Sequence, residues 1–263
     1  MEVDYYKKLF QTIGNIIVLI EKDDIPKYLL FLENAFPYMD NYNYYKGMNG
    51  IIQELTGLLK TKNIGTDSDR ALLLDFQATL ETKPEKAIKL EKDALAQIEN
   101  ITADNARLVS NLHANLGGLY RMNGHPDLAR EHMEKSISLL DQFNLLHIND
   151  SIPQIANYAM FLTEQQEPER GISELQKLSG IIKEYHSDDC LDYAKVQENL
   201  GTIYLMTANL PQAKTHFKKA FKIYEKIWAD EPEMIEAKYQ EIQELYPQIG
   251  FCIGKNLSGL LTK

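Results

Sequence analysis

Apolar residues recur along most of this chain at three- and four-residue steps, the spacing that places them on one face of a helix. Near the amino terminus the pattern runs from Tyr5 to Ile20, and it resumes after Asp24-Ile25-Pro26, a cap followed by a proline in a first turn. A third stretch extends from about Tyr44 to Lys60. We therefore expect residues 1–65 to be helical, without a clear repeat.

From about residue 66 onward, a 42-residue unit governs the pattern. The segment from Asn115 to Tyr120 returns at 199–204 and, in weaker form, at 157–162. Prolines also recur every 42 residues, each after a short polar turn at which a second helix would start. Small residues keep the same phase in that second helix. The recurring positions are Pro84, Pro126 and Pro168 for the prolines and Ala87, Ala129, Gly171 and Ala213 for the small residues.

A fixed period of this size is typical of a helical repeat array. Each unit predicts a helix, a short turn, a second helix and a longer connection, so the expected fold class is all-α. The expected helix pairs lie at about 66–100, 103–144, 150–185 and 188–229. Residues 1–65 would form an amino-terminal helical cap or degenerate repeats. Residues 230–263 would form a capping helix from about Pro232 to Leu245 and a tail.

The best unit resembles a tetratricopeptide repeat: Asn199-Leu200-Gly201-x-x-Tyr204, followed by Ala213, Phe217 and Ala220. The unit that begins at Asn115 has Gly117, Tyr120, Ala129, Met133 and Ser136 at the same places. The unit at 152–185 diverges, with Ala159 for the glycine and Gly171 for the first alanine. The unit at 68–100 carries Asp75 and Ala78 where Gly and Tyr are expected.

This resemblance implies a right-handed α-solenoid of antiparallel helix pairs, with the Gly and the first Ala at the helix crossing. The usual period of the family is about 34 residues. The 42-residue form is similar to the repeats of kinesin light chain and of many bacterial signalling and sensor proteins.

The resemblance also implies a non-enzymatic scaffold or sensor that binds a protein or an extended peptide in its concave groove. Positions four, seven and eleven residues apart share one helix face. In the family, such a face of the first helix of each unit lines the groove, and here that face carries Asn115, Asn157 and Asn199. A primary amide both donates and accepts hydrogen bonds, which suits a peptide backbone, and methionine adds adaptable apolar contact. The other candidate groove residues are Asn111, Arg121, Met122, Met160, Lys195, Thr202 and Met206.

Two interpretations of these residues stay open. The asparagines could instead belong to the repeat consensus and bond a neighbouring helix. Arg121 and Lys195 are candidates for binding a ligand carboxylate, although either one alone is more simply a solvated charge.

The equivalent helix face of the first unit is largely apolar: Asp69, Leu73, Phe76 and Leu80. We expect the amino-terminal helices to pack there and close one end of the groove.

Charge and targeting signals narrow the partners. The net charge of −10 argues against a general binder of nucleic acid or anionic membrane. Cys190 and Cys252 read as reduced thiols of a cytosolic protein. The amino terminus carries acids where a signal peptide needs bases, and the apolar run from Ile13 to Ile20 is well short of the about 20 residues that span a bilayer. We expect a cytoplasmic location.

Catalytic motifs are missing from the sequence. The six histidines show no His-Glu-x-x-His spacing, and there is no Cys-x-x-Cys pair or phosphate-binding Gly-x-x-x-x-Gly-Lys loop. The cluster from His186 to Cys190 is better explained as a helix start than as a metal site. We expect no catalytic residue, metal or cofactor.

The alternatives to peptide binding are a structural array that self-associates through its last repeat, or the ligand-sensing part of a larger signalling system. The sequence predicts neither the ligand nor the oligomeric state.

Overall fold

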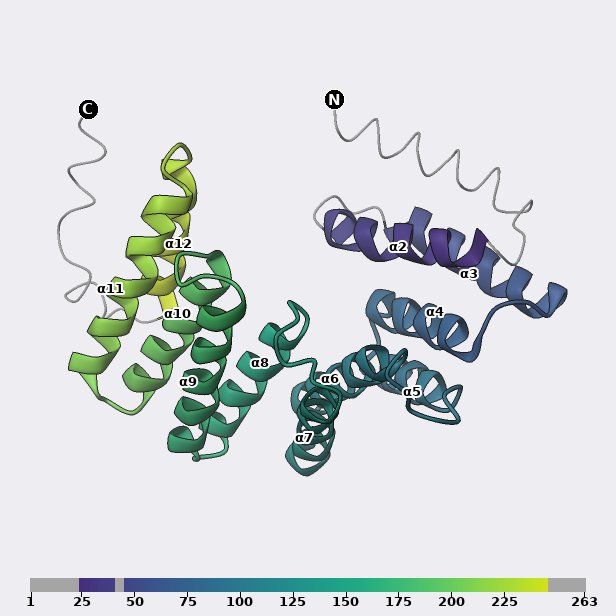
Figure 1. The fold of residues 1–263 in the computed structure, drawn as a ribbon, viewed down its shortest axis with the longest axis horizontal. Helices are drawn as coiled ribbons and strands as arrows, with labels where there is room; N and C mark the ends of the chain where they lie inside the picture. Colours follow the sequence, from purple (N-terminus) through teal and green to yellow (C-terminus); the bar gives the residue numbers. More distant parts are fainter. Residues whose placement is uncertain (1–23, 41–44, 246–263) are drawn as a thin grey trace. The chain divides into compact units, whose positions relative to one another are not determined.

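The computed structural model describes residues 24–40 and 45–245. The expected helix from Tyr5 to Ile20 and the tail from Pro247 lie outside the described residues. The described chain is helical, and its helices are connected by turns and loops (Figure 1). They are α2 (Ile25–Asp40), α3 (Tyr45–Lys62), α4 (Asp67–Leu80), α5 (Pro84–Leu95), α6 (Ala106–Met122), α7 (Pro126–Gln142), α8 (Ser151–Glu164), α9 (Pro168–Tyr185), α10 (Leu191–Met206), α11 (Leu210–Ile227) and α12 (Pro232–Leu245).

The chain divides into two compact units, which we call unit 1 (Met1–Phe143) and unit 2 (Asn144–Lys263). The described part of unit 1 holds α2 to α7, and that of unit 2 holds α8 to α12. The division falls between the second and the third of the expected helix pairs. Each unit therefore contains two of these pairs and is described by itself.

Helices pack pairwise within each unit, α4 with α5 and α6 with α7 in unit 1, and α8 with α9 and α10 with α11 in unit 2. The predicted proline positions are confirmed. Pro84, Pro126 and Pro168 are the first residues of α5, α7 and α9, and Pro211 is the second residue of α11. A proline in a first turn removes no intrahelical hydrogen bond, and its fixed φ suits the helix, so these residues define where each second helix begins.

The small residues lie where paired helices approach closely, as predicted. Ala87, Ala129, Gly171 and Ala213 are all buried. A Cβ atom added to Gly171 would lie 2.5 Å from the carbonyl oxygen of Ala159, and one added to Gly201 would lie 2.9 Å from the ring of Phe217. These separations are far below ordinary van der Waals contact, so the crossing leaves no room for a side chain.

The amino-terminal helices pack on the first pair, as the apolar stripe of α4 predicted. Leu73 and Phe76 of α4 belong to one buried cluster with residues of α2 and α3, and Leu80 packs against it. Arg107 of α6 and Glu33 of α2 also form an ion pair at 3.6 Å. Burial of this apolar area is the dominant stabilising contribution of such a cluster.

In unit 2, α12 docks on the last helix pair, and it begins at Pro232 as predicted. Ile235 and Ile242 are buried, and the ring of Tyr239 meets Phe221 of α11 edge to face, with centroids 6.0 Å apart. A terminal helix of this kind covers an apolar face that a repeat array would otherwise expose.

Candidate peptide-binding surface

The predicted groove residues of unit 2 lie on α8 and α10, which are the first helices of their pairs and contact each other. Asn157 is exposed on α8, and Asn199 is partly buried on α10. Neither side-chain amide makes a hydrogen bond within the part of the chain that the structure describes. Both amides therefore keep their donors and acceptors for solvent or a ligand.

The residues around these amides combine charge with apolar surface. Lys195 is exposed one turn before Asn199. Met206 is 48% exposed at the end of α10, whereas Met160 of α8 is partly buried. Thr202 is only 8% exposed, so little of its hydroxyl group can reach a ligand. Among the predicted residues of unit 2, the accessible groups are therefore two amides, one cation and a flexible thioether.

The predicted residues of unit 1 lie on α6, and Asn115 differs from its two copies. The Asn115 side chain is exposed, but its Nδ2 donates to Oδ1 of Asp75 on α4 at 2.8 Å. Asn115 thus bonds a neighbouring helix. Met122 is 80% exposed, while Asn111 and Arg121 are partly buried. The groove role of these residues stays a prediction.

Sequence reasoning missed a buried carboxyl pair next to Asn115. Asp75 of α4 and Glu91 of α5 are side-chain hydrogen-bond partners, and Asn115 is within hydrogen-bonding reach of both. Glu91 is only 1% exposed, and its Oε2 atom has no hydrogen-bond partner. Burial, then the charge of Asp75, raises the pKa of Glu91 to about 10. Burial also raises the pKa of Asp75, so the pair holds a proton at neutral pH.

The segment from His186 to Cys190 connects α9 to α10, and only its last residue caps the start of α10, which we expected acids to cap. Cys190 precedes α10, and its Sγ accepts a hydrogen bond from the backbone N–H of Tyr193 at 3.4 Å. Ser187 Oγ accepts from the backbone N–H of Asp189, and Asp189 pairs with Lys226 of α11. Within residues 24–40 and 45–245, no group of three or more His, Cys, Asp or Glu side chains is arranged to hold a metal ion.

A second polar network, also missed from the sequence, joins α12 to the last pair. Tyr224 of α11 donates its hydroxyl proton to Glu198 Oε2 at 2.6 Å. Lys238 of α12 lies 2.9 Å from Glu198 Oε1. Burial alone would lower the pKa of Lys238, but its contacts with Glu198 and Glu241 raise it overall. This network fixes a terminal helix and shows no sign of a reacting group.

The comparisons with known proteins agree with this architecture. Residues 151–226, which span α8 to α11, match the family described as Tetratricopeptide repeat. No curated protein sequence matches the chain significantly. A putative kinesin light chain of Podosopora anserina with nearly identical TPR-like repeats has a TM-score of 0.63 at 13% identity, over 80% of this chain and 99% of that one.

Two further solved structures share the fold. A Rap protein complexed with Competence and Sporulation Factor has a TM-score of 0.58 at 14% identity, over 95% of this chain and 72% of that one. BtubC from P. vanneervenii has a TM-score of 0.51 at 17% identity, over 78% of this chain and 74% of that one. The predicted all-α solenoid class is confirmed: this is a protein of paired helical repeats. The match to the tetratricopeptide repeat family covers α8 to α11, and the fold of the chain is similar to that of solved structures with TPR-like repeats.

Among the described residues, no helix combines the length and the apolar character needed to cross a membrane. Repeats of this kind generally serve as protein-interaction scaffolds, which is the functional class that the fold supports.

Proposed function

We propose that this protein is a non-enzymatic binding module or sensor that holds an extended peptide on the surface formed by α8 and α10. The observation that carries the proposal is the pair of unbonded amides, Asn157 and Asn199. They occupy the same repeat position 42 residues apart on two helices that contact each other. A regular spacing of amides fits a peptide backbone, because each peptide unit offers one donor and one acceptor.

The neighbouring side chains indicate what the peptide would carry. Exposed Lys195 suits a carboxylate, and Met206 suits an apolar side chain because its thioether adapts to different shapes. The Rap protein of similar fold was solved in complex with Competence and Sporulation Factor, which supports a ligand-binding role for an array of this kind. A cytoplasmic location and a role in signalling belong to the same proposal.

The test is a double variant, Asn157→Ala with Asn199→Ala. Peptides that bind the wild-type protein would be selected from a random library and their affinities measured by calorimetry. We expect the double variant to bind them at least about tenfold more weakly, because each lost hydrogen bond contributes about 1 kcal/mol. Helical content, measured by circular dichroism, should stay unchanged because neither amide belongs to the buried core or bonds another described residue.

A matched control removes two other exposed amides of unit 2, Asn149→Ala with Gln176→Ala, and should bind as the wild type does. Asn115 is kept out of the first test because its substitution would also disturb Asp75. Equal affinity in the wild type and the Asn157/Asn199 variant would rule out the amide ladder. Light scattering over a range of concentrations tests the self-associating alternative, which a strict monomer excludes.

A further inference from the structure

A cleft of about 540 Å³ lies in unit 1, where the end of α3, the first half of α4 and the turn after α5 meet. Its size falls within the range of small-molecule sites, which is about 300–1,000 Å³. The lining consists of three leucines, two cations, two amides and a threonine: Leu59, Leu73, Leu74, Lys60, Arg70, Asn63, Gln97 and Thr56. The cleft shares no residue with the proposed peptide-binding surface of unit 2.

The cleft exists because α5 is short. It has 12 residues, whereas α7, α9 and α11, the second helices of the later pairs, have 17, 18 and 18. Within a helix hairpin the end of the second helix lies beside the start of the first. When α5 stops at Leu95, it leaves Arg70 and Leu74 of α4 only partly covered. The gap falls between two apolar clusters, because Leu59 and Leu73 belong to one and Leu74 packs against the other.

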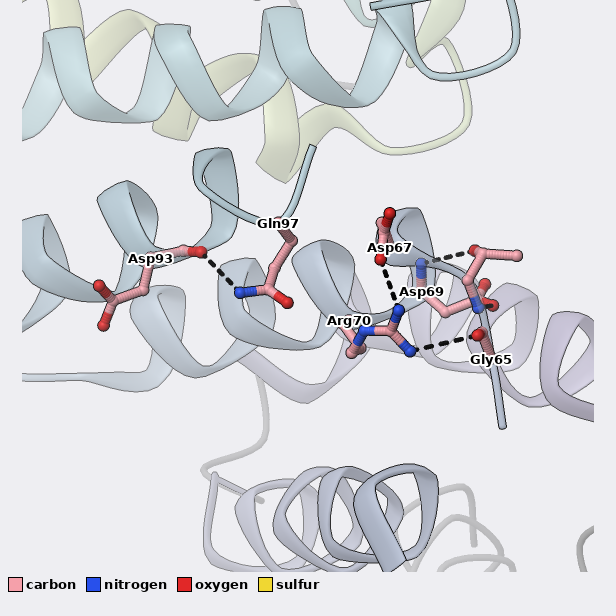
Figure 2. Close-up of polar contacts among 7 residues, drawn as sticks. Gly65, Asp67, Asp69, Arg70, Asp93 and Gln97 are labelled. Atoms are coloured by element: carbon pink, nitrogen blue, oxygen red, sulfur yellow. Dashed lines mark hydrogen bonds and ion pairs between the residues drawn. The ribbon is translucent and has the colours of Figure 1, made fainter. Parts of the chain in front are cut away.

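Arg70 is held in place at one side of this cleft (Figure 2). Its guanidinium donates to the carbonyl oxygen of Gly65 at 3.2 Å and to the carboxylate of Asp67. A capping box between Thr66 and Asp69 fixes the turn that presents it. A guanidinium has five N–H donors, so these two bonds leave others for a ligand, in an orientation that is already set.

The cleft lining carries more positive than negative charge. Lys60 is exposed and makes no hydrogen bond or ion pair with any residue that the structure describes. No aspartate or glutamate is part of the lining, although Asp67 at the edge pairs with Arg70. Gln97 Nε2 donates to the carbonyl oxygen of Asp93 at 3.3 Å, which fixes the amide and leaves it a second N–H. A ligand with an anionic group matches this lining better than a cation does.

We propose that this cleft binds a small organic carboxylate with an apolar body. The apolar body packs against the partly exposed Leu74, above the buried Leu59 and Leu73, and the carboxylate faces Lys60 and Arg70. Burial of the body supplies most of the affinity, as in other concave sites with apolar walls. The two cations supply the preference for an acid over its uncharged analogue, because hydrogen bonds between charged groups are stronger than neutral ones.

The test uses 3-phenylpropionate as the probe and 3-phenylpropionamide as its uncharged counterpart, with binding to the full chain followed by calorimetry and by amide NMR shifts. We expect the acid to bind at least about tenfold more tightly than the amide. The shifts should centre on Leu74 and Gln97. Lys60→Gln should weaken binding of the acid by about the same factor and leave binding of the amide unchanged. Arg70→Gln should act in the same direction, and circular dichroism would report any loss of helix that this substitution causes.

The matched control is Lys86→Gln, an exposed lysine at the other end of α5, which should bind the acid as the wild type does. A further variant, Leu74→Trp, fills the cleft and should abolish binding of both probes. The proposal is overturned if acid and amide bind equally, if Lys60→Gln binds the acid like the wild type, or if millimolar acid shifts no amide near the cleft. These outcomes leave peptide binding by unit 2 untouched, since neither cation lies in that unit.

Discussion

Asp75 and Glu91 place two carboxyl groups in contact at the crossing of α4 and α5, where the later repeats have a small residue (Gly117, Ala159 and Gly201) and a large apolar side chain. Asp75 lies 42 residues before Gly117, and Glu91 lies 42 residues before Met133. In the pairs α6–α7 and α10–α11 these positions make a close approach, since a Cβ on Gly117 would lie 2.6 Å from Met133 Cγ and one on Gly201 would lie 2.9 Å from the ring of Phe217. The first pair thus replaces tight apolar packing with a buried acid pair that shares a proton.

This pair should make the stability of unit 1 fall as the pH rises. The folded-state pKa of Glu91 is raised to about 10 from a reference of 4.5, so the folded protein keeps a proton that the unfolded chain releases. The contribution of this proton to the free energy of unfolding is therefore fully present below about pH 4.5. It declines as the pH rises toward 10, by at most about 1.4 kcal/mol per pH unit for one proton. Glu33 of α2, itself paired with Arg107, adds to the effect by raising the pKa of Asp75.

Glu91→Gln removes the titrating group at constant size, and urea unfolding at pH 6, 7, 8 and 9 would measure the result. We expect the variant to be more stable than the wild type, with a difference in unfolding free energy that grows with pH. The control is Glu85→Gln, an exposed glutamate in the first turn of α5, for which the difference should stay constant. Parallel pH profiles for the wild type and Glu91→Gln would show that the pair does not hold a proton.

Two glycines of α9 should respond in opposite directions to substitution by alanine. A Cβ at Gly171 meets the backbone oxygen of Ala159 at 2.5 Å, and a backbone atom cannot move aside as a side chain can. We expect Gly171→Ala to cost about 1–3 kcal/mol through overpacking. Gly180 is exposed with nothing near its missing Cβ, so Gly180→Ala should stabilise the helix by about 0.5–1 kcal/mol. Thermal unfolding of both variants measures this, and similar shifts for the two would contradict our assignment of the repeat phase.

The helical repeat could be predicted from the sequence because prolines and small residues mark each unit at a constant period. The contact between Asp75 and Glu91, in contrast, was not predicted from the sequence. Asp75 is visible in the sequence as a departure from the repeat, but its meaning depends on Glu91, 16 residues later. Gly117 and Met133 are also 16 residues apart, as are Gly201 and Phe217, and both pairs are in contact at a helix crossing. Comparing both members of that pair across repeats would have revealed the buried contact.

Other features depend on details that carry no local signal. The helix α5 ends at Leu95 although the next residues, Ala-Gln-Ile-Glu-Asn, contain no glycine or proline, so the cleft beside it could not be predicted. The hydrogen bond between Asn115 and Asp75 also could not, because a polar stripe on one helix does not reveal whether a neighbouring helix offers a partner. For this reason the three asparagines look equivalent in sequence but differ in their contacts.

The two histidines that face each other between α6 and α7 should destabilise the fold at low pH. His113 Nδ1 and His132 Nδ1 lie 2.8 Å apart. Burial, then the charges of His132 and Lys135, lowers the pKa of His113 to about 4, and burial also lowers that of His132. The stabilisation from these neutral rings is present above about pH 6.5 and is lost as the pH falls toward 4. Imidazole resonances followed by NMR should show His113 still neutral at pH 5.5, and a midpoint near 6.5 would contradict its burial between the helices.

The docking of α12 should depend on Lys238, because the lysine and Glu198 are only 20% and 16% exposed and neutralise each other. Lys238→Ala leaves the largely buried Glu198 carboxylate with Tyr224 as its remaining described partner, and we expect this to cost about 1–3 kcal/mol. Hydrogen exchange should show the loss first in the amides of α12, which is held by few contacts beyond this network.

Two further variants separate the charge effect from a simple loss of side-chain packing. Lys222→Ala removes an exposed lysine of α11 and should leave exchange in α12 unchanged. Combining Lys238→Ala with Glu198→Gln removes both charges, so the double variant should be less destabilised than the sum of the single changes. If the two effects simply add, the ion pair does not hold α12, and its apolar contacts through Ile235 and Ile242 are sufficient by themselves.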